Sequence, residues 1–339
     1  MPNRPILVAT RGSALALAQA NLVLAQCRAA FPKLRFEMKT IKTTGDKLQN
    51  ASMAKADTSL PKGLFTKELE IALIKGQADL AVHSLKDLPT DLPAGLKLAA
   101  TPKRADVRDV LIYRDAAFIK TRAADVKSEE WTPGQDALRG FAPHLKLKDL
   151  PQGATIATSS TRRKAQLLAQ RPDLNTVEIR GNVSTRMQKV ADRAELDATV
   201  LALAGLTRLN FLVTPDGKLH GDAVPDGLLA TILDVEVMLP CAGQGAIGIE
   251  IRADDERIVT ICERLNHFNT FQCVTAERAF LHGMGGGCQS PVAAHAEITG
   301  SRIEMRAVSF RDGPARRSEG KRPIKEAAAL GEQLAAELK

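Results

Sequence analysis

Short apolar strands that run into polar turns, most of them followed by a helix, recur along this chain of 339 residues. We predict such strands at residues 6–10, 79–84, 154–158, 176–179 and 197–202. Strands that alternate with helices favour a largely parallel sheet with helices on its faces. In open α/β sheets, ligands bind beyond the carboxyl ends of the strands. The pattern therefore predicts an α/β fold and places candidate functional residues at the strand ends.

Each of these five strand ends presents arginine or lysine beside small or hydroxyl residues. Charges that were merely solvated would not be expected to recur at one topological position. The net charge of +8 implies an anionic partner. Nucleic acid is one candidate, but an aromatic content of 4% leaves few platforms on which single-stranded bases could stack. A small polycarboxylate or phosphate ligand fits the composition as well.

The strand at 79–84 runs directly into Lys86 and Asp87, and Pro89 prevents a normal helix start. A carboxylate at this edge can stabilise a cationic intermediate or move a proton. The adjacent ammonium group keeps the carboxylate ionised and attracts anions. A salt bridge on a surface loop is the alternative interpretation of the same residues.

The strongest single signal is a hydroxyl-rich turn that opens a helix at Ser160 and places Arg162 and Arg163 in its first turn. The helix dipole disfavours cations at this end, so an anionic ligand would relieve the strain. The alternative is that both charges are unfavourable but solvated. Near the N-terminus, Ser13 is predicted to cap a helix that runs to about residue 30, and Arg11 precedes it. This arrangement suits a carboxylate, although a simple cap with a solvated arginine would look the same.

Five cysteines, an odd number with no Cys-x-x-Cys pair, argue against a disulfide framework and a zinc site, and for a reducing cytoplasm. The N-terminus lacks the apolar core of a signal peptide, and no apolar run is long enough to span a membrane. Cys288 follows three glycines, an exposed setting that makes a covalent role reasonable. The other four are expected in the core: Cys27, Cys241, Cys262 and Cys273.

Residues 243–248 match the dinucleotide-binding fingerprint, but the β-like segment that follows argues against nucleotide binding. Residues 115–150 are expected to be a long excursion with little core. The last part of the chain predicts an α+β domain, with helices at 254–265, 270–282 and 323–338 and strands at 292–298 and 302–310.

Five motifs together are similar to those of the hydroxymethylbilane synthase (porphobilinogen deaminase) family, in the family's order and over nearly the whole chain. They are His83-Ser84-Leu85-Lys86-Asp87-Leu88-Pro89, residues 158–163, residues 180–186, residues 243–246 and residues 286–289. The resemblance implies a transferase that condenses four porphobilinogen molecules, with release of ammonia, into the linear tetrapyrrole hydroxymethylbilane. A dipyrromethane cofactor primes the chain through a thioether. By resemblance, Cys288 is the attachment point and Asp87 the catalytic carboxylate.

The resemblance also assigns residues that bind the cofactor and the substrate, and it implies no metal. The cofactor-binding residues are Ser84, Lys86, Ser160, Arg162, Arg163 and Gln244. The substrate-binding residues are Arg11, Ser13, Phe65, Arg180, Arg186 and Arg208, with Lys55 and Lys62 in or beside the same cleft.

The implied fold has two doubly wound α/β domains like those of periplasmic binding proteins and a smaller α+β domain. We expect domain 1 at 1–104 and 244–265, domain 2 at 105–243 with an insertion at about 115–150, and domain 3 at 266–339. The expected partners are porphobilinogen and, for the product, uroporphyrinogen-III synthase, with no nucleic acid and no membrane. The expected state is a cytoplasmic monomer.

Two other classes of protein compete with this interpretation. A two-domain small-molecule anion-binding protein without catalysis would use the same arginines but would have no need of the glycine-rich segment before Cys288. A nucleic-acid-binding protein would explain the charge of +8, but not its confinement to strand ends.

Overall fold

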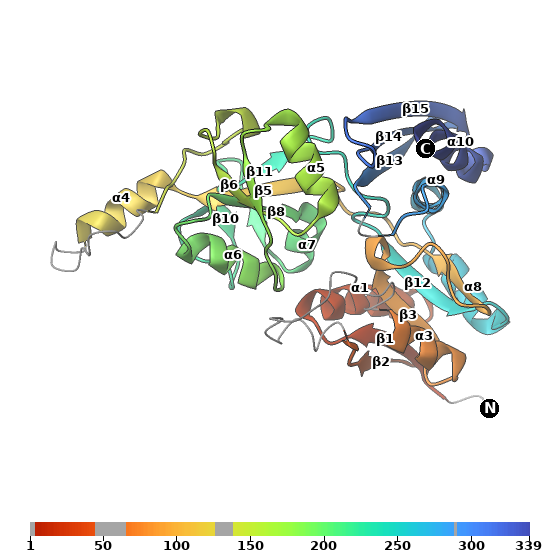
Figure 1. Cartoon of the computed structure of the whole chain (residues 1–339). Helices are drawn as coiled ribbons and strands as arrows, with labels where there is room; N and C mark the ends of the chain where they lie inside the picture. The colour runs from red at the N-terminus through yellow and green to blue at the C-terminus, as the bar shows by residue number, and fades with distance from the viewer. Residues whose placement is uncertain (1–3, 45–65, 126–137, 288–289) are drawn as a thin grey trace. The chain divides into compact units, whose positions relative to one another are not determined.

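The computed structural model describes residues 4–44, 66–125, 138–287 and 290–339. The chain divides into two compact units (Figure 1). One comprises Met1–Val107 and Leu239–Lys339, and the other comprises Arg108–Met238. The three-domain boundaries expected from the sequence remain predictions.

The first unit contains a five-stranded sheet in the order β2-β1-β3-β12-β4. Its strands are β1 (Ile6–Arg11), β2 (Phe36–Ile41), β3 (Leu80–Ser84), β4 (Leu96–Ala100) and β12 (Ile247–Arg252). The first three are mutually parallel, whereas β12 runs antiparallel to both β3 and β4. The carboxyl ends of β1 and β3 therefore lie side by side at one edge of this sheet.

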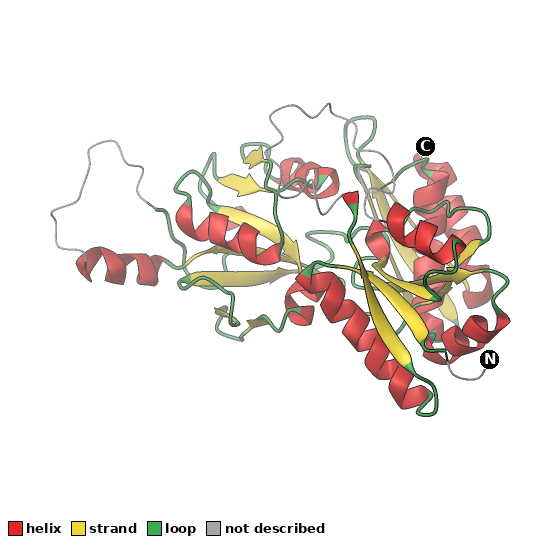
Figure 2. Ribbon diagram, turned by 90° about the horizontal axis from the view of Figure 1, so that it is seen from below, coloured by secondary structure: helices red, strands yellow, loops and turns green. Residues whose placement is uncertain are grey.

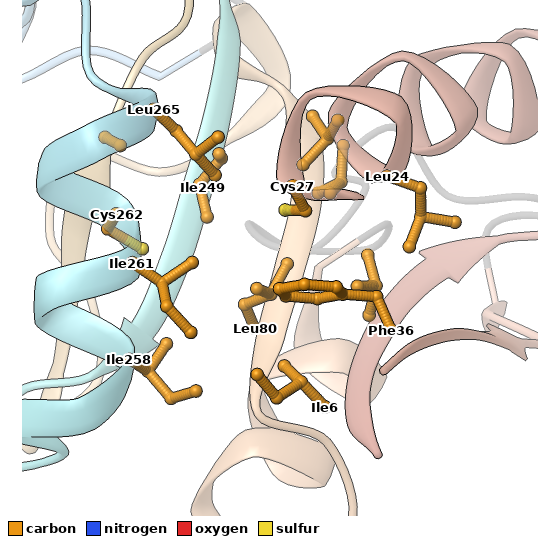
Figure 3. Close-up of a cluster of buried hydrophobic side chains, with 14 of the residues drawn as sticks. Ile6, Leu24, Cys27, Phe36, Leu80, Ile249, Ile258, Ile261, Cys262 and Leu265 are labelled. Atoms are coloured by element: carbon orange, nitrogen blue, oxygen red, sulfur yellow. The ribbon is translucent and has the colours of Figure 1, made fainter. Parts of the chain in front are cut away.

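Helices cover both faces of this sheet because alternate side chains of its strands point to opposite faces. Helices α1 (Ala14–Ala30) and α8 (Glu256–Leu265) pack on one face, and α3 (Lys67–Ile74) packs on the other. Figure 3 shows the apolar side chains that meet on the first face. They include Ile6, Leu24, Phe36, Leu80, Ile249, Ile258 and Ile261.

The second unit repeats the topology of the first sheet. Its order is β11-β5-β8-β6-β7, with β6 parallel to β7 and β8, and β5 antiparallel to β8 and β11. These strands are β5 (Asp109–Arg114), β6 (Thr155–Ala157), β7 (Asn175–Val177), β8 (Ala198–Ala202) and β11 (Leu228–Leu233). In both sheets, the antiparallel strand follows the point where the chain enters that unit.

Helices α5 (Thr161–Gln170), α6 (Val183–Asp192) and α7 (Leu203–Arg208) follow β6, β7 and β8 in turn. Their N-termini therefore lie along one edge of the second sheet. Two short strands, β9 (Leu212–Val213) and β10 (Leu219–His220), pair as a separate hairpin.

The excursion expected at 115–150 contributes more to the core than its composition indicates. Helix α4 (Ala116–Asp125) opens it, and the short helix η2 (Leu147–Asp149) lies near its end. Leu145, Leu147 and Leu150 are buried in the core of the second unit, so the expectation of little core is wrong there. Three leucines among prolines and charges give no regular period, which is why the pattern concealed their burial.

The last part of the chain forms a three-stranded antiparallel sheet covered by two helices. The strands are β13 (Val292–Thr299), β14 (Arg302–Ser309) and β15 (Arg316–Pro323), and the helices are α9 (Phe268–Gly283) and α10 (Ala327–Leu338). The short helix η3 (Ile324–Glu326) connects β15 to α10. A Cβ atom on Gly331 would lie 2.1 Å from the Ala276 carbonyl oxygen, so a glycine is required where α10 crosses α9.

A buried carboxylate fixes α9 to the two segments that carry the chain out of and back into the first unit. Glu277 accepts hydrogen bonds from Arg104 Nη1 at 2.7 Å and from Arg104 Nη2 at 2.9 Å. It also accepts from the backbone amides of Gly243 at 2.7 Å and Ala296 at 2.9 Å. Burial alone would raise the pKa of Glu277, but Arg104 and His295 lower it to about 2.

The fold therefore comprises two doubly wound α/β domains and a smaller α+β domain, as expected. Figure 2 shows the strands and helices from which these layers are built. In the part of the chain that the structure describes, none of the helices combines the length and apolar character needed to cross a membrane.

Candidate active site

Asp87 lies in a single helical turn that follows β3, the short helix η1 (Leu85–Asp87). The turn rests on the glycine-rich segment 243–246, because Leu85 N donates to the Ala246 carbonyl oxygen at 3.1 Å. A Cβ atom on Gly243, which has φ of 73°, would lie 3.2 Å from Lys86 N. Of the glycines that match a dinucleotide fingerprint, Gly243 and Gly245 precede strand β12 and Gly248 lies within it; Gly243 and Gly248 allow close packing against the turn that carries Asp87.

A cavity of about 70 Å³ lies at the edge of the first sheet where β1 and β3 end. Four of the residues predicted from the sequence line it: Arg11, Ser13, Ser84 and Asp87. They come from the end of β1, the start of α1, the last residue of β3 and the turn that follows it. Ser13 also caps α1 as predicted, since its hydroxyl accepts a hydrogen bond from Ala16 N at 3.3 Å.

The cavity also contains side chains that the sequence did not single out. Gln19 is buried in α1, and its Nε2 donates to Ser84 Oγ at 2.9 Å. His83 lines the cavity too, and its Nε2 lies 3.0 Å from the fully buried Glu250 carboxylate. The helical spacing of Gln19 with the buried Ala16 and Ala20 could have indicated that this amide faces inward.

The arginines predicted at the start of α5 are buried, and they form an ion-paired cluster inside the second unit. Arg162 Nη2 donates to Asp109 Oδ2 at 2.8 Å, and Arg163 Nη2 donates to Asp109 Oδ1 at 2.7 Å. Ser160 caps the helix by accepting from Arg163 N at 3.4 Å. The alternative that these charges are solvated is therefore wrong, and the protein itself supplies one carboxylate beside any anionic ligand. Sequence reasoning missed Asp109 because it begins an antiparallel strand instead of ending a parallel one.

Three further arginines come from the segments that follow β7 and β8 in the second unit. Arg180 follows β7, is exposed, and lies 3.6 Å from Glu178. Arg186 is in the first turns of α6, and its Nε donates to the Gly181 carbonyl oxygen at 2.8 Å. Arg208 ends α7, where burial lowers its pKa to about 10, so the guanidinium stays charged at neutral pH.

Two predicted cofactor-binding residues do not line the cavity, and four other predicted site residues lie outside the described part of the chain. Lys86 is half-buried and is not among the side chains that line the cavity. Gln244 is fully buried, and its Nε2 donates to the Val107 carbonyl oxygen at 2.6 Å, so it holds the segment that leaves the first unit. The remaining four lie outside the described residues: Lys55, Lys62, Phe65 and Cys288.

The other cysteines follow the expectation with one exception. Cys27, Cys262 and Cys273 are buried, whereas Cys241 is half-buried. Among the residues that the structure describes, no group of three His, Cys, Asp or Glu side chains is arranged to hold a metal ion.

The equivalent sheet edges of the two units thus carry chemically different sets of side chains. In the first unit, one carboxylate lies near one arginine and two hydroxyl groups, a setting in which a cation can be stabilised and a proton accepted. In the second, five arginines occur in the segments that follow β6, β7 and β8, and two of them pair with the buried carboxylate of Asp109, a setting that suits carboxylate or phosphate groups. The arginines are Arg162, Arg163, Arg180, Arg186 and Arg208.

Comparison with known proteins agrees with this chemistry. Residues 6–260 match the family described as "Porphobilinogen deaminase, dipyromethane cofactor binding domain", and residues 271–339 match "Porphobilinogen deaminase, C-terminal domain". Among solved structures, the BenM effector binding domain with its effector benzoate is similar with a TM-score of 0.38 and 14% identity, over 77% of this chain and 90% of that chain. A likeness as weak as that carries no argument about the site.

The curated relatives are much more similar in sequence. The porphobilinogen deaminase of Syntrophomonas wolfei is 40% identical over 90% of this chain and 85% of its own length. That of Clostridioides difficile is 41% identical over 88% of this chain and 85% of its own. The relative from Desulforamulus reducens is 38% identical over 98% of this chain and 94% of its own. This chain therefore belongs to the porphobilinogen deaminase family.

Proposed function

We propose that this chain is a hydroxymethylbilane synthase in which Asp87 is the catalytic carboxylate and Cys288 carries the dipyrromethane cofactor. The reaction joins four porphobilinogen molecules head to tail and releases ammonia at each step. The observation that carries the proposal is the cavity in which Asp87 lies with Arg11, Ser13 and Ser84 at two adjacent strand ends.

Substrate binding follows from the charge of the ligand. Porphobilinogen carries an acetate and a propionate side chain, and arginine forms paired, charge-assisted hydrogen bonds with such groups. Arg11 would bind a carboxylate of the ring that faces Asp87, because both side chains line the same cavity. Arg180, Arg186 and Arg208, which follow β7 and β8, would bind carboxylate side chains of rings already added.

The residues at the start of α5 fit an acidic pyrrole cofactor. Two buried guanidinium groups share the single carboxylate of Asp109, and Arg163 Nε is buried without a hydrogen-bond partner among the described residues. We assign Ser160, Arg162 and Arg163, and also Ser84 and Lys86, to binding of the cofactor's carboxylate side chains. When bound, the cofactor supplies the pyrrole ring to which the first substrate is joined.

Asp87 acts on charge that develops during each condensation. Departure of ammonia from the aminomethyl group leaves a cation whose charge is shared by the pyrrole nitrogen, and a carboxylate close to that nitrogen stabilises it. The α-carbon of the receiving pyrrole ring attacks this cation. When the new carbon–carbon bond has formed, that α-carbon releases its proton, and Asp87 can accept it. A hydrogen bond of 2.9 Å between Gln19 and Ser84 fixes these two side chains, which line the same cavity.

The role of Asp87 is tested by Asp87→Asn, which keeps the shape of the side chain and removes its charge. We expect the variant to bind porphobilinogen but to have a kcat at least about a hundredfold below that of the wild type. Asp91→Asn is the matched control, because Asp91 is nearby in sequence but has a side chain that is 76% exposed. A kcat for Asp87→Asn within a few-fold of the wild-type value would refute the role.

The attachment of the cofactor is tested by intact-mass spectrometry of the purified protein. The wild type should weigh two pyrrole units more than the bare chain and should colour with Ehrlich's reagent. Cys288→Ser should lack both the extra mass and the colour, whereas Cys241→Ser, the change at a half-buried cysteine, should keep them. Extra mass on Cys288→Ser would assign the attachment to another residue. A protein that binds porphobilinogen without turnover or added mass would instead be the non-catalytic anion-binding protein.

Further expectations concern the surroundings of the reaction. We expect the protein to work as a monomer in the cytoplasm and to pass its product to uroporphyrinogen-III synthase. Light scattering of the purified protein tests the monomer, and a coupled assay with that synthase tests the transfer of the product.

A further inference from the structure

The buried acidic residue beneath the arginines of the second unit has no counterpart among the residues singled out from the sequence. Asp109 is the first residue of β5 and is fully buried. Its two carboxylate oxygens each accept a hydrogen bond from a different guanidinium group, at 2.8 Å from Arg162 and at 2.7 Å from Arg163. One side chain thus contacts both of the consecutive arginines.

Such a partner is needed because the position of these arginines is unfavourable. Adjacent cations repel one another, and both occupy the first turn of α5, where the helix dipole disfavours positive charge. Their side chains are nevertheless only 4% and 7% exposed. A buried charge is retained only when it is paired and hydrogen-bonded. Asp109 therefore accounts for the inward orientation of Arg162 and Arg163.

The pairing leaves binding capacity for a ligand. One carboxylate between two guanidinium groups gives this set of three side chains a net positive charge. Arg163 Nη1 donates to the Val200 carbonyl oxygen at 2.8 Å, so the guanidinium is fixed from two directions. Its Nε is buried and has no hydrogen-bond partner within the described ranges. A fixed cation with a remaining donor suits one carboxylate group of a ligand.

We propose that Asp109 is a positioning residue, a buried counter-ion that fixes Arg162 and Arg163 in the orientation in which they bind a carboxylate side chain of a pyrrole ligand. This inference rests on the proposed function, because the ligand is the acidic pyrrole that the family assignment supplies. Asp109 itself does not contact the ligand. Its effect passes through the two arginines.

The test compares Asp109→Asn and Asp109→Glu with Asp197→Asn. Asp197 is a buried acid of the same unit that accepts from Thr155 N at 2.8 Å, so it controls for the loss of any buried carboxylate. For each full-length protein, we would measure the fraction that carries two pyrrole units, the kcat, and the labelling of each arginine by a dicarbonyl reagent. The labelled positions are identified by peptide mass mapping.

For Asp109→Asn we expect labelling of Arg162 and Arg163 to increase, and the pyrrole-loaded fraction or the kcat of the loaded protein to fall at least about tenfold. Asp109→Glu should partly restore both properties, and Asp197→Asn should change neither. Arg114, also buried in this unit, should stay protected, which distinguishes release of the two arginines from general unfolding.

Two results would overturn the inference directly, and a third would do so by showing general unfolding. One is unchanged labelling of both arginines in Asp109→Asn, and the other is release of the arginines with normal loading and kcat. Increased labelling of Arg114 together with the other two would assign Asp109 a purely structural role. If the wild type carried no pyrrole units at all, the proposed function would fail while the labelling still reported on the Asp109 contact. The two failures are therefore distinguishable.

Discussion

Replacing Glu277 by glutamine removes a negative charge from the fully buried cluster that joins α9 to Arg104, Gly243 and Ala296. The substitution keeps the size of the side chain but weakens both hydrogen bonds from Arg104. The Arg104 side chain is only 9% exposed, so its charge would lose its partner in a site that water barely reaches. Removing one partner of a buried ion pair costs about 3–5 kcal/mol.

The lowered pKa of Glu277 gives a second value for the free energy that its ionised form contributes to folding. Its pKa is about 2 in the folded protein against an ordinary value of 4.5, because Arg104 and His295 outweigh the effect of burial. Each pKa unit corresponds to about 1.4 kcal/mol, so ionised Glu277 contributes about 3 kcal/mol to the free energy of unfolding. Since the folded pKa is depressed, this contribution is present above pH 4.5 and is lost as the pH falls towards 2.

Hydrogen exchange is the suitable assay because it reports on the cluster itself. The amides of Gly243 and Ala296 donate to Glu277, and at pH 7 their protection should fall about a hundredfold in Glu277→Gln. Urea unfolding at pH 7 and at pH 3 should show that the difference from wild type shrinks at the lower pH. Glu297→Gln is the control, because Glu297 is 58% exposed and lies 4.0 Å from Arg306, a pair worth at most about 1 kcal/mol.

If Glu277→Gln destabilised the protein no more than the control Glu297→Gln does, the stabilising role of the Glu277 charge would be refuted. A destabilisation of the same size at pH 3 and pH 7 would also contradict it, because the effect would then come from packing and not from charge.

Two further predictions concern titrating groups. Burial and the nearby Glu250 raise the pKa of Glu70 above its ordinary value of 4.5, so its ionisation opposes folding. Glu70→Gln should therefore gain stability relative to wild type as the pH rises from 4.5, measured by urea unfolding, and a difference that is the same at every pH would contradict this. When the thiols of the native protein are titrated, Cys241 should react first among the described cysteines. Burial raises the pKa values of the other three to about 11 or 12, and rapid reaction of those three would contradict this prediction. The protected residues are Cys27, Cys262 and Cys273.

The strands that matter most for the site could be predicted because their signal is local. The segments of β1, β3, β6 and β8 are short apolar runs that end in polar turns, and the structure places each of them in a sheet. The topological rule for parallel strands then indicated that Arg11 and Asp87 share one edge, and they line one cavity. Ser13 was recognisable as a cap because its partner lies three residues away, and Ser160 caps α5 in the same way.

Other elements could not be predicted because their stability depends on partners that are distant in the sequence. Strand β15 has no apolar residue between its first position and Pro323, and its pairing with β14 forms it. Strand β11 also went unrecognised; it pairs with β5, more than a hundred residues away. Leu145 and Leu150 have no regular spacing to neighbours, yet the core of the second unit buries both.

The sequence by itself determined the α/β layers, the capped helices and the residue types at the parallel strand ends, because hydrogen bonding and periodicity act over a few residues. Only the tertiary structure decided which polar groups are buried and what neutralises them. Asp109 reaches Arg162 across 53 positions, and Glu277 reaches Arg104 across 173. The charges of these residues are visible in the sequence. Their pairing depends on how the sheets and helices pack, and no local pattern encodes it.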